Sequence, residues 1–407
     1  MKMHINFEKL LFPLFAIWLI ISSFYYIGNF IDGEVTSERP ERVFQQIFKY
    51  LAAIFFSGSF FLLHKKTSLL IQYTVLVFAL FIMSICWLYG YNTIPAIHVL
   101  IVLFSFIGLI YATSSFKEEQ IVILAKVVVF SACIAAAISY FEYYFMEPVL
   151  GDYWNNTGGF RSVSTFLNPN NSGLFFGAAL ILIFFNNKFY PLIKFVICPI
   201  IFGALLLSGS RTAWISLVVA FSLGVLYRGR GKIDALNLFK LTILILFLVA
   251  VFSALYSMNL LYLPERMTDM YTAALRLEKY FEYVAGVDSA YLFPDFDLLR
   301  IDIVSESAYF HFVNALGGMW FVVIIVSWLS FVRLAWLVNL FSTSPYRCFD
   351  IVVFYYFFAM LFENVLMSFP NNQLLFVSLG IAVMNTRNGL VGKLNYSQLN
   401  FSRGLKE

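Results

Sequence analysis

The chain has 407 residues, of which 61% are hydrophobic and only 12% charged. Soluble globular domains contain about 45–50% apolar and about 25% charged residues. An aqueous core could not hide this excess, which includes 48 Phe, so the composition excludes a soluble globular domain. The net charge of +4 is small, and no nucleic-acid partner is expected. The four cysteines lie in or beside apolar blocks and predict neither a disulfide framework nor a metal cluster.

The apolar residues occur in blocks of about 20, the length needed to cross about 30 Å of hydrocarbon. The first block is too long for the apolar part of a signal peptide and is followed by no small-residue cleavage site, so we interpret it as a retained span. The blocks predict an all-α, polytopic integral membrane protein with about 12 transmembrane helices. The predicted spans are 10–30, 46–63, 69–89, 95–115, 121–145, 172–187, 192–208, 212–227, 236–258, 306–337, 349–368 and 372–386.

An even number of spans places both ends of the chain on the same side of the membrane. With both ends inside (N-in, C-in), the inner side carries twice as many of the 27 Lys and Arg residues as the outer side. This bias fits the positive-inside rule and supports the N-in, C-in orientation of a multi-pass protein. Three long outer segments follow, at 31–45, 146–171 and 259–305. The last predicts a periplasmic cap on a single transmembrane domain that comprises residues 1–407.

Polar residues cluster at the predicted outer face, and ionisable groups within membranes tend to mark function. In the first cluster Arg161 precedes the run Asn168-Pro169-Asn170-Asn171-Ser172. One of the last three residues of this run is expected to cap an inward-running helix. The positive end of such a helix attracts anions, and the forked donors of arginine suit phosphate. The alternative is a capped helix start beside an arginine that binds lipid headgroups.

The second cluster is the tight outer turn Ser208-Gly209-Ser210, followed by Arg211 and Thr212. A serine is expected to cap the next helix, which places Arg211 at the positive end of that helix. An arginine there repels the helix dipole unless an anion bridges the two, so this turn also predicts an anion site. A headgroup phosphate would relieve the same repulsion, and this alternative stays open.

The third cluster begins the span at 306–337, where Glu306 suits a base or a neutralising acid. The alternative is an acid that merely stabilises a first helical turn. His311 lies about one turn deeper and either takes part in the site or only packs. Glu363 and Asn364 are predicted inside the span at 349–368, roughly 7 Å below its outer end by helix rise, where a carboxylate needs a partner. The candidate partners are Arg161, Arg211 and Arg276.

Other motifs predict no metal and no cofactor. Asp295 and Asp297 have the D-x-D spacing that nucleotide-sugar transferases use for a divalent metal, but they lie in the predicted outer loop, where nucleotide sugars are absent. The four histidines are scattered, which argues against a histidine-bound metal. The chain has no P-loop and no Rossmann glycine pattern in a suitable context, which disfavours ATP-driven transport.

Taken in order, these segments resemble the O-antigen polymerase and ligase superfamily over about residues 120–385. Ligases resemble one another in a His-Asn pair after the large loop. The matching place here reads Glu306-Ser307, which is more like the polymerase branch. The resemblance is carried by Arg161 with Phe166-Leu167-Asn168-Pro169-Asn170, by Ser210-Arg211-Thr212-Ala213, by Arg276 with Gly286, and by Glu306-Ser307-Ala308-Tyr309 with Gly317-Gly318.

The resemblance implies a metal-independent membrane glycosyltransferase of surface polysaccharide or lipopolysaccharide biosynthesis. It also implies a multi-pass protein of a bacterial inner membrane, with its active site facing the periplasm. Its donor and acceptor would both be oligosaccharide repeat units linked to undecaprenyl diphosphate, joined at the outer face of the bilayer. Glu306 and Arg211 are the expected catalytic residues. A chain-length regulator protein is left open as a further partner. The diphosphate and glycan are expected to be bound by Arg161, Asn168, Asn170, Arg211, Arg276, His311 and Glu363.

Two other functions compete with a polymerase. A ligase would transfer the finished glycan to lipid A core or to a protein. A flippase for lipid-linked oligosaccharides is also commonly a twelve-span protein, but it should carry charges along spans in both halves and have short loops. The concentration of charge at one face and the long segment at 259–305 favour the enzyme.

Overall fold

The computed structural model describes residues 7–26, 43–63, 161–226 except Leu167, 307–311 and 347–383, most residues between 102 and 146, and the single residues Glu278 and Phe281. All regular structure in these segments is helical, with no strand among them, which confirms the all-α prediction for this part of the chain. The predicted spans at 69–89, 236–258 and 306–337, and the loop at 259–305, lie wholly or largely outside the described residues, and the span at 95–115 is described in part.

Each long described helix overlaps a predicted span. A π-helical turn, η1 (Glu142–Met146), extends α6, and a 3-10 turn, η3 (Val365–Met367), follows α16. The final described helix is Asn371–Val383. The labelled helices are α1 (Phe7–Ser23), α3 (Val43–Leu63), α6 (Glu118–Phe141), α8 (Pro169–Phe185), α9 (Pro191–Leu207), α10 (Arg211–Leu226) and α16 (Arg347–Ala359).

Among the described residues, one helix is both long and apolar enough to cross a membrane by itself. It is the continuous helix Glu118–Phe145, with 28 residues and a mean hydropathy of 2.7. Further apolar helices, such as Pro169–Phe185 and Pro191–Leu207, are shorter. The total of about twelve spans therefore stays a prediction.

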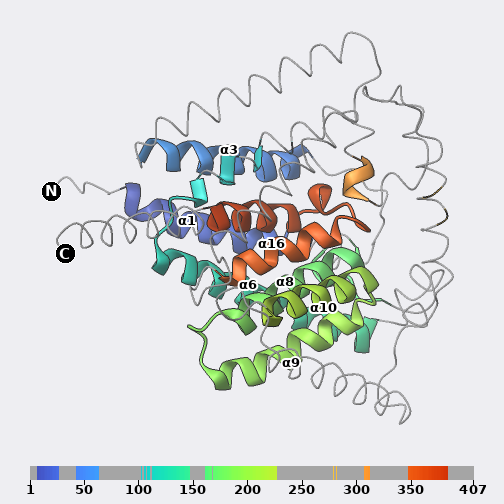
Figure 1. Ribbon diagram of the computed structural model, residues 1–407. Helices are drawn as coiled ribbons and strands as arrows, with labels where there is room; N and C mark the ends of the chain where they lie inside the picture. Colours follow the sequence, from blue (N-terminus) through green and yellow to red (C-terminus); the bar gives the residue numbers. More distant parts are fainter. Residues whose placement is uncertain are drawn as a thin grey trace, which may run out of the picture.

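Helix α8 forms the centre of the bundle. It contacts α6, α9, α10 and α16, and its side chains from Asn171 to Ile183 are buried. A helix that is apolar on every side is stable only when protein or lipid surrounds it. The helices of the bundle lie side by side, with α3 and α9 on opposite sides (Figure 1). The central position of α8 makes its two ends the natural places for polar contacts between the surrounding helices.

Helices at the edge of the bundle expose apolar faces. On α9, Leu192 and Phe195 are 73% and 78% exposed. On α1 the exposed residues recur at spacings of three or four and so share one helix face. Contiguous apolar surface of this kind is rare on soluble proteins and marks contact with a membrane or another protein. The exposed residues of α1 are Leu10, Leu14, Ile17 and Ile21.

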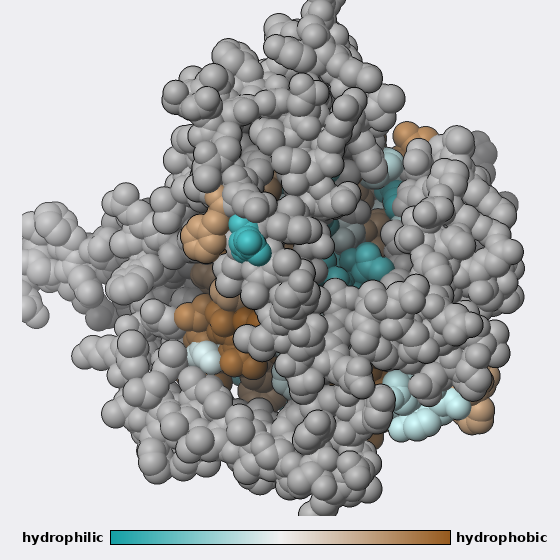
Figure 2. All heavy atoms as spheres, turned by 90° about the vertical axis from the view of Figure 1, so that its right-hand side faces the viewer, coloured by the Kyte–Doolittle hydropathy of each residue, from teal (hydrophilic) through white to brown (hydrophobic). Residues whose placement is uncertain are grey.

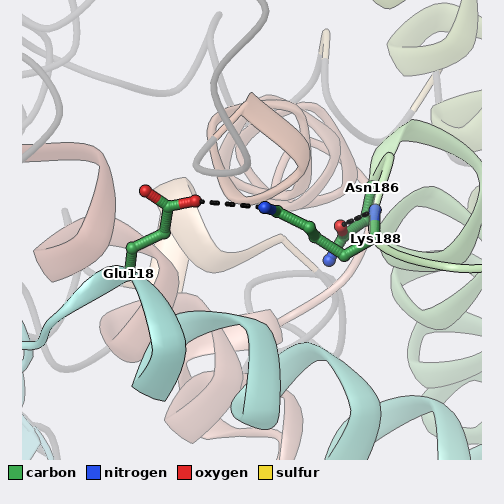
Figure 3. Close-up of polar contacts among 3 residues, drawn as sticks. All are labelled: Glu118, Asn186 and Lys188. Atoms are coloured by element: carbon green, nitrogen blue, oxygen red, sulfur yellow. Dashed lines mark hydrogen bonds and ion pairs between the residues drawn. The ribbon is translucent and has the colours of Figure 1, made fainter.

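One end of the bundle is marked by an ion pair between α6 and the loop from α8 to α9. Lys188 Nζ lies 3.5 Å from Oε1 of Glu118, the first residue of α6 (Figure 3). The Lys188 backbone N–H donates to Asn186 Oδ1 at 2.9 Å, which fixes the loop. Both charged side chains are about half exposed, so the pair contributes at most about 1 kcal/mol. The ion pair nevertheless shows that the start of α6 and the loop after α8 lie at the same end of the bundle.

The start of α16 lies at the same end. Arg347 Nη2 donates a hydrogen bond to the Gly224 carbonyl, near the end of α10. The Arg347 guanidinium also lies 5.6 Å from the ring centroid of Phe185, the last residue of α8. Segments that the charge bias assigns to the inner side thus meet at one end of the bundle, and the described residues of the predicted outer segment 146–171 lie at the other. Which end faces the outside stays a prediction.

Candidate functional site

Arg161 ties together the start of α8 and the turn after α9. Its Nε donates to the Ser208 carbonyl at 2.9 Å, and its Nη2 donates to Asn170 Oδ1 at 2.6 Å. The neighbouring Ser162 N–H donates to the Leu207 carbonyl at 3.0 Å. Arg161 is only 3% exposed, so these contacts hold a buried cation. A guanidinium is suited to such a bridge because its donors point in fixed directions.

Asn170 extends this contact to a carboxylate from a distant part of the chain. Asn170 Nδ2 donates to Glu363 Oε1 at 2.7 Å, so one amide connects Arg161 with Glu363. Thr212 Oγ1 lies 3.5 Å from the same carboxylate oxygen. The structure thus brings three of the predicted site residues together, Arg161, Asn170 and Glu363, and Arg211 directly precedes Thr212 in the chain.

The start of α8 differs from the prediction by a few residues. The cap is Asn168, whose Oδ1 accepts the Asn171 N–H at 2.9 Å, and the helix begins at Pro169. The prediction that Asn170, Asn171 or Ser172 caps the helix is therefore wrong. Proline suits the first helical position because its missing N–H would have no partner there, and it keeps Asn168 extended, at φ −149° and ψ 163°. The observed role of Asn168 is to cap the helix, which leaves Asn170 to reach Arg161.

The turn between α9 and α10 has the tight form that its sequence predicts. Gly209 adopts φ 60°, which glycine tolerates without cost, and its N–H donates to the Leu206 carbonyl at 2.9 Å. Ser210 Oγ accepts the Ala213 N–H at 3.4 Å and so caps α10. Arg211 is the first residue of α10 and is partly exposed, at the positive end of the helix as expected.

Gly173 lets α8 approach this turn closely. A Cβ at residue 173 would lie 2.6 Å from Ser210 Cβ and 2.7 Å from Ser208 Oγ, both closer than real contacts allow. We expect Gly173→Ala to push the turn away from α8 and to lower the free energy of unfolding by about 1–3 kcal/mol. The loss is measured as a lower melting temperature of the purified protein.

The control for this substitution is Gly58→Ala on α3. A Cβ at residue 58 would meet nothing within 4 Å, so the same chemical change adds no clash. We expect this variant to melt at the wild-type temperature or above, since alanine favours a helix over glycine. Equal melting temperatures for Gly173→Ala and Gly58→Ala would contradict the close approach of α8 to the turn.

The exit of α16 corrects the prediction for Glu363. The helix ends at Ala359, so Glu363 and Asn364 lie in the following turn and not inside a helical span. The apolar run through Met367 hides this end in the sequence. The turn is supported by neighbouring protein, because the Met360 carbonyl accepts the Ala308 N–H at 3.1 Å. Irregular backbone at membrane depth is tolerated where protein covers it.

The remaining predicted residues are placed only in part. Arg276 and Glu306 lie outside the described residues. His311 is partly buried in the helical segment after Ser307, and its N–H donates to the Ser307 carbonyl at 2.9 Å. Because Ala308 in the same segment binds Met360, His311 belongs to the end of the bundle at which α16 terminates.

This end of the bundle is the right-hand side of Figure 1, where the orange segment contains Ala308 and His311. Figure 2 views the molecule from that side. Hydrophilic described residues, in teal, are visible near the middle of the face, and hydrophobic ones, in brown, lie beside them. Polar surface is therefore present at the same end as the contacts of Arg161 and Glu363.

Two residues of the cluster were not predicted. Thr212 is a neutral residue beside Arg211, and only the fold shows that it faces Glu363. Glu142 is 1% exposed and accepts hydrogen bonds from three consecutive residues that follow Arg161. The sequence could have indicated Glu142, because it is an acid inside the span predicted at 121–145, and ionisable residues inside spans tend to mark function.

No family model, curated protein sequence or solved structure matches the chain. The cluster itself indicates what it can bind. The carboxylates of Glu142 and Glu363 balance the charges of the two arginines, so an anion would be attracted by the directed guanidinium donors and by the positive N-terminal ends of α8 and α10. Arg211 and Glu363 are partly exposed, whereas Arg161 is buried. Among the described residues, no group of three His, Cys, Asp or Glu side chains is placed to hold a metal ion.

Proposed function

We propose that the protein is a polymerase of O-antigen or a related surface polysaccharide in a bacterial inner membrane. It has about twelve spans, both ends in the cytoplasm and the site facing the periplasm. The composition, the helical fold, the buried α8 and the exposed apolar faces of α1 and α9 all support insertion in a membrane. The resemblance of the ordered sequence segments to the polymerase and ligase superfamily supports the reaction.

The observation that carries this proposal is the contact of Arg161 with Asn170 and of Asn170 with Glu363. Residues that the sequence singles out as an anion site, from three separate segments, meet at one end of the bundle. That end also receives the segment at 307–311, which follows the long loop at 259–305, and the predicted role of this loop is to grip sugar. Arginine donors and helix N-termini beside apolar helices suit a ligand with an anionic head and a polyprenyl tail.

The reaction joins two lipid-linked repeat units. A hydroxyl at the non-reducing end of the acceptor attacks the anomeric carbon of the donor glycan. The bond from that carbon to the phosphate oxygen breaks, and undecaprenyl diphosphate leaves with the bonding electron pair. Preorganised cations stabilise the charge that develops on the leaving group, a role for Arg211, Arg161 and Arg276. Glu306 receives the proton of the acceptor hydroxyl.

The test is the glycan pattern of a deletion strain. We expect loss of the gene to leave single repeat units on the lipopolysaccharide, because transfer to lipid A core continues without polymerisation. Complementation with the full chain should restore the ladder of long glycans. Lipopolysaccharide without any repeat unit would indicate a ligase. Accumulation of lipid-linked repeat units on the cytoplasmic side would indicate a flippase.

A further inference from the structure

We propose that Glu142 is a positioning residue of the site, whose buried carboxylate fixes the turn at 162–164 and thereby the guanidinium of Arg161. The inference rests on the proposed function, because its test uses undecaprenyl diphosphate as the ligand. Glu142 is the first residue of the π-helical turn η1, directly after α6. Such turns often lie at functional sites, where they redirect a side chain.

The carboxylate is bound by a compact set of donors. Ser162 Oγ donates to Oε2 at 2.7 Å, and the Ser164 N–H donates to the same oxygen at 2.7 Å. The Val163 N–H lies 3.1 Å from Oε1 and 3.0 Å from Oε2. Successive backbone N–H groups that converge on one anion form an anion-binding nest, and here the anion belongs to the protein.

Placing the Glu142 carboxylate here costs folding free energy, which argues that it contributes to the site. An acid at the C-terminal end of a helix faces the negative end of the dipole. Burial adds a desolvation cost, since only 1% of Glu142 is exposed. Ser164 adopts φ 57°, a left-handed conformation that is unfavourable for a residue other than glycine. The hydrogen bonds of the carboxylate offset these costs and select one conformation of the turn.

The other contacts of the turn lead to the elements that hold Arg161. The Ser162 N–H binds Leu207 at the end of α9, and the Ser162 carbonyl accepts from Ser172 Oγ of α8 at 3.3 Å. Thr165 Oγ1 donates to the Ser23 carbonyl of α1 at 2.7 Å. A shift of the turn would therefore change the position of Arg161 relative to Ser208 and Asn170. Glu142 acts on the ligand only through Arg161.

The experiment measures binding of undecaprenyl diphosphate to the purified full chain in lipid nanodiscs, with undecaprenyl monophosphate for comparison. We expect the wild type to prefer the diphosphate and Glu142→Gln to weaken its binding about tenfold, the scale of one lost charge-assisted hydrogen bond. The melting temperature without ligand should stay close to that of the wild type. Glu119→Gln, an exposed acid in the first turn of the same helix, is the matched control and should bind normally.

A double-substitution cycle separates positioning from a general structural effect. In an Arg161→Ala background, Glu142→Gln should cause no further loss of affinity, because its effect passes through the missing guanidinium. An equal loss in both backgrounds would overturn the proposal. If Glu142→Gln fails to accumulate, Glu142→Asp takes its place. Its shorter side chain cannot reach all three donors, so we expect severalfold weaker binding, and full affinity would overturn the proposal.

The two proposals fail in different ways. Equal binding of monophosphate and diphosphate by the wild type, or normal binding by Arg161→Ala, would refute the diphosphate site itself. Weak binding by Arg161→Ala together with normal binding by Glu142→Gln would leave the diphosphate site standing and refute only the role of Glu142.

Discussion

Arg161→Ala is expected to abolish long-chain glycan, with a loss of polymerisation of at least about 100-fold, while the protein still accumulates in the membrane. Removal of the guanidinium leaves Asn170 and the Ser208 carbonyl without their donor and removes a buried positive charge from the site. The ladder of glycans from a complemented deletion strain measures the effect. A membrane fraction probed for the protein shows that insertion is unchanged.

Arg161→Lys tests whether polymerisation depends on the hydrogen-bond directions of the guanidinium or only on its positive charge. A lysine keeps the charge but cannot donate in the fixed directions that reach both Ser208 and Asn170, so we expect poor rescue. Lys188→Ala is the matched control, because it removes a cation from the opposite end of the bundle, where the ion pair with Glu118 is exposed. It should give a normal ladder. A normal ladder from Arg161→Ala would exclude the residue from the site.

Glu363→Gln is expected to lower polymerisation about tenfold to a hundredfold, and Glu363→Ala more. The carboxylate accepts from Asn170 and lies near Thr212, and a hydrogen bond to a charged group contributes about 1.5–3 kcal/mol. The glutamine keeps an acceptor but loses the charge, so Asn170 is held less firmly. The rate of chain extension by purified protein, with donor and acceptor supplied, measures this loss.

Two further variants are compared with Glu363→Gln. Thr212→Val removes only the contact at 3.5 Å and should lower the rate less than Glu363→Gln does. Glu118→Gln removes an exposed acid at the far end of α6 and should leave the rate unchanged. If Glu363→Gln and Glu118→Gln give the same rate, the carboxylate of Glu363 has no part in the site.

The sequence predicts helix bounds well wherever a polar or turn residue interrupts an apolar run. The bounds of α9 and α10 differ from the predicted spans by one residue at each end, because Pro191, Ser208 and Arg211 mark the changes. At α8 the same rule gives a start three residues too late. There Asn168-Pro169 has the pattern of a turn, although Pro169 is the first residue of the helix.

The exit of α16 and the contacts of the site were harder to predict. The residues from Phe349 to Met367 form an almost continuous apolar run, so the helix end at Ala359 has no marker in composition. The need of Glu363 for a partner follows from its charge alone. The packing of α16 against α8 places the amide of Asn170 between Glu363 and Arg161. No local sequence pattern encodes that packing.

The large separation of Asn170 and Glu363 in the chain has a consequence for biosynthesis. They are 193 positions apart, so at about 5–20 residues per second the ribosome needs about 10–40 s to add the second after the first. During that interval Arg161 and Asn170 are already made, while the acid that completes their contact is not. Helix α8 must wait beside α6, α9 and α10 until α16 is made, so assembly of the cluster is a late event in the synthesis of this chain.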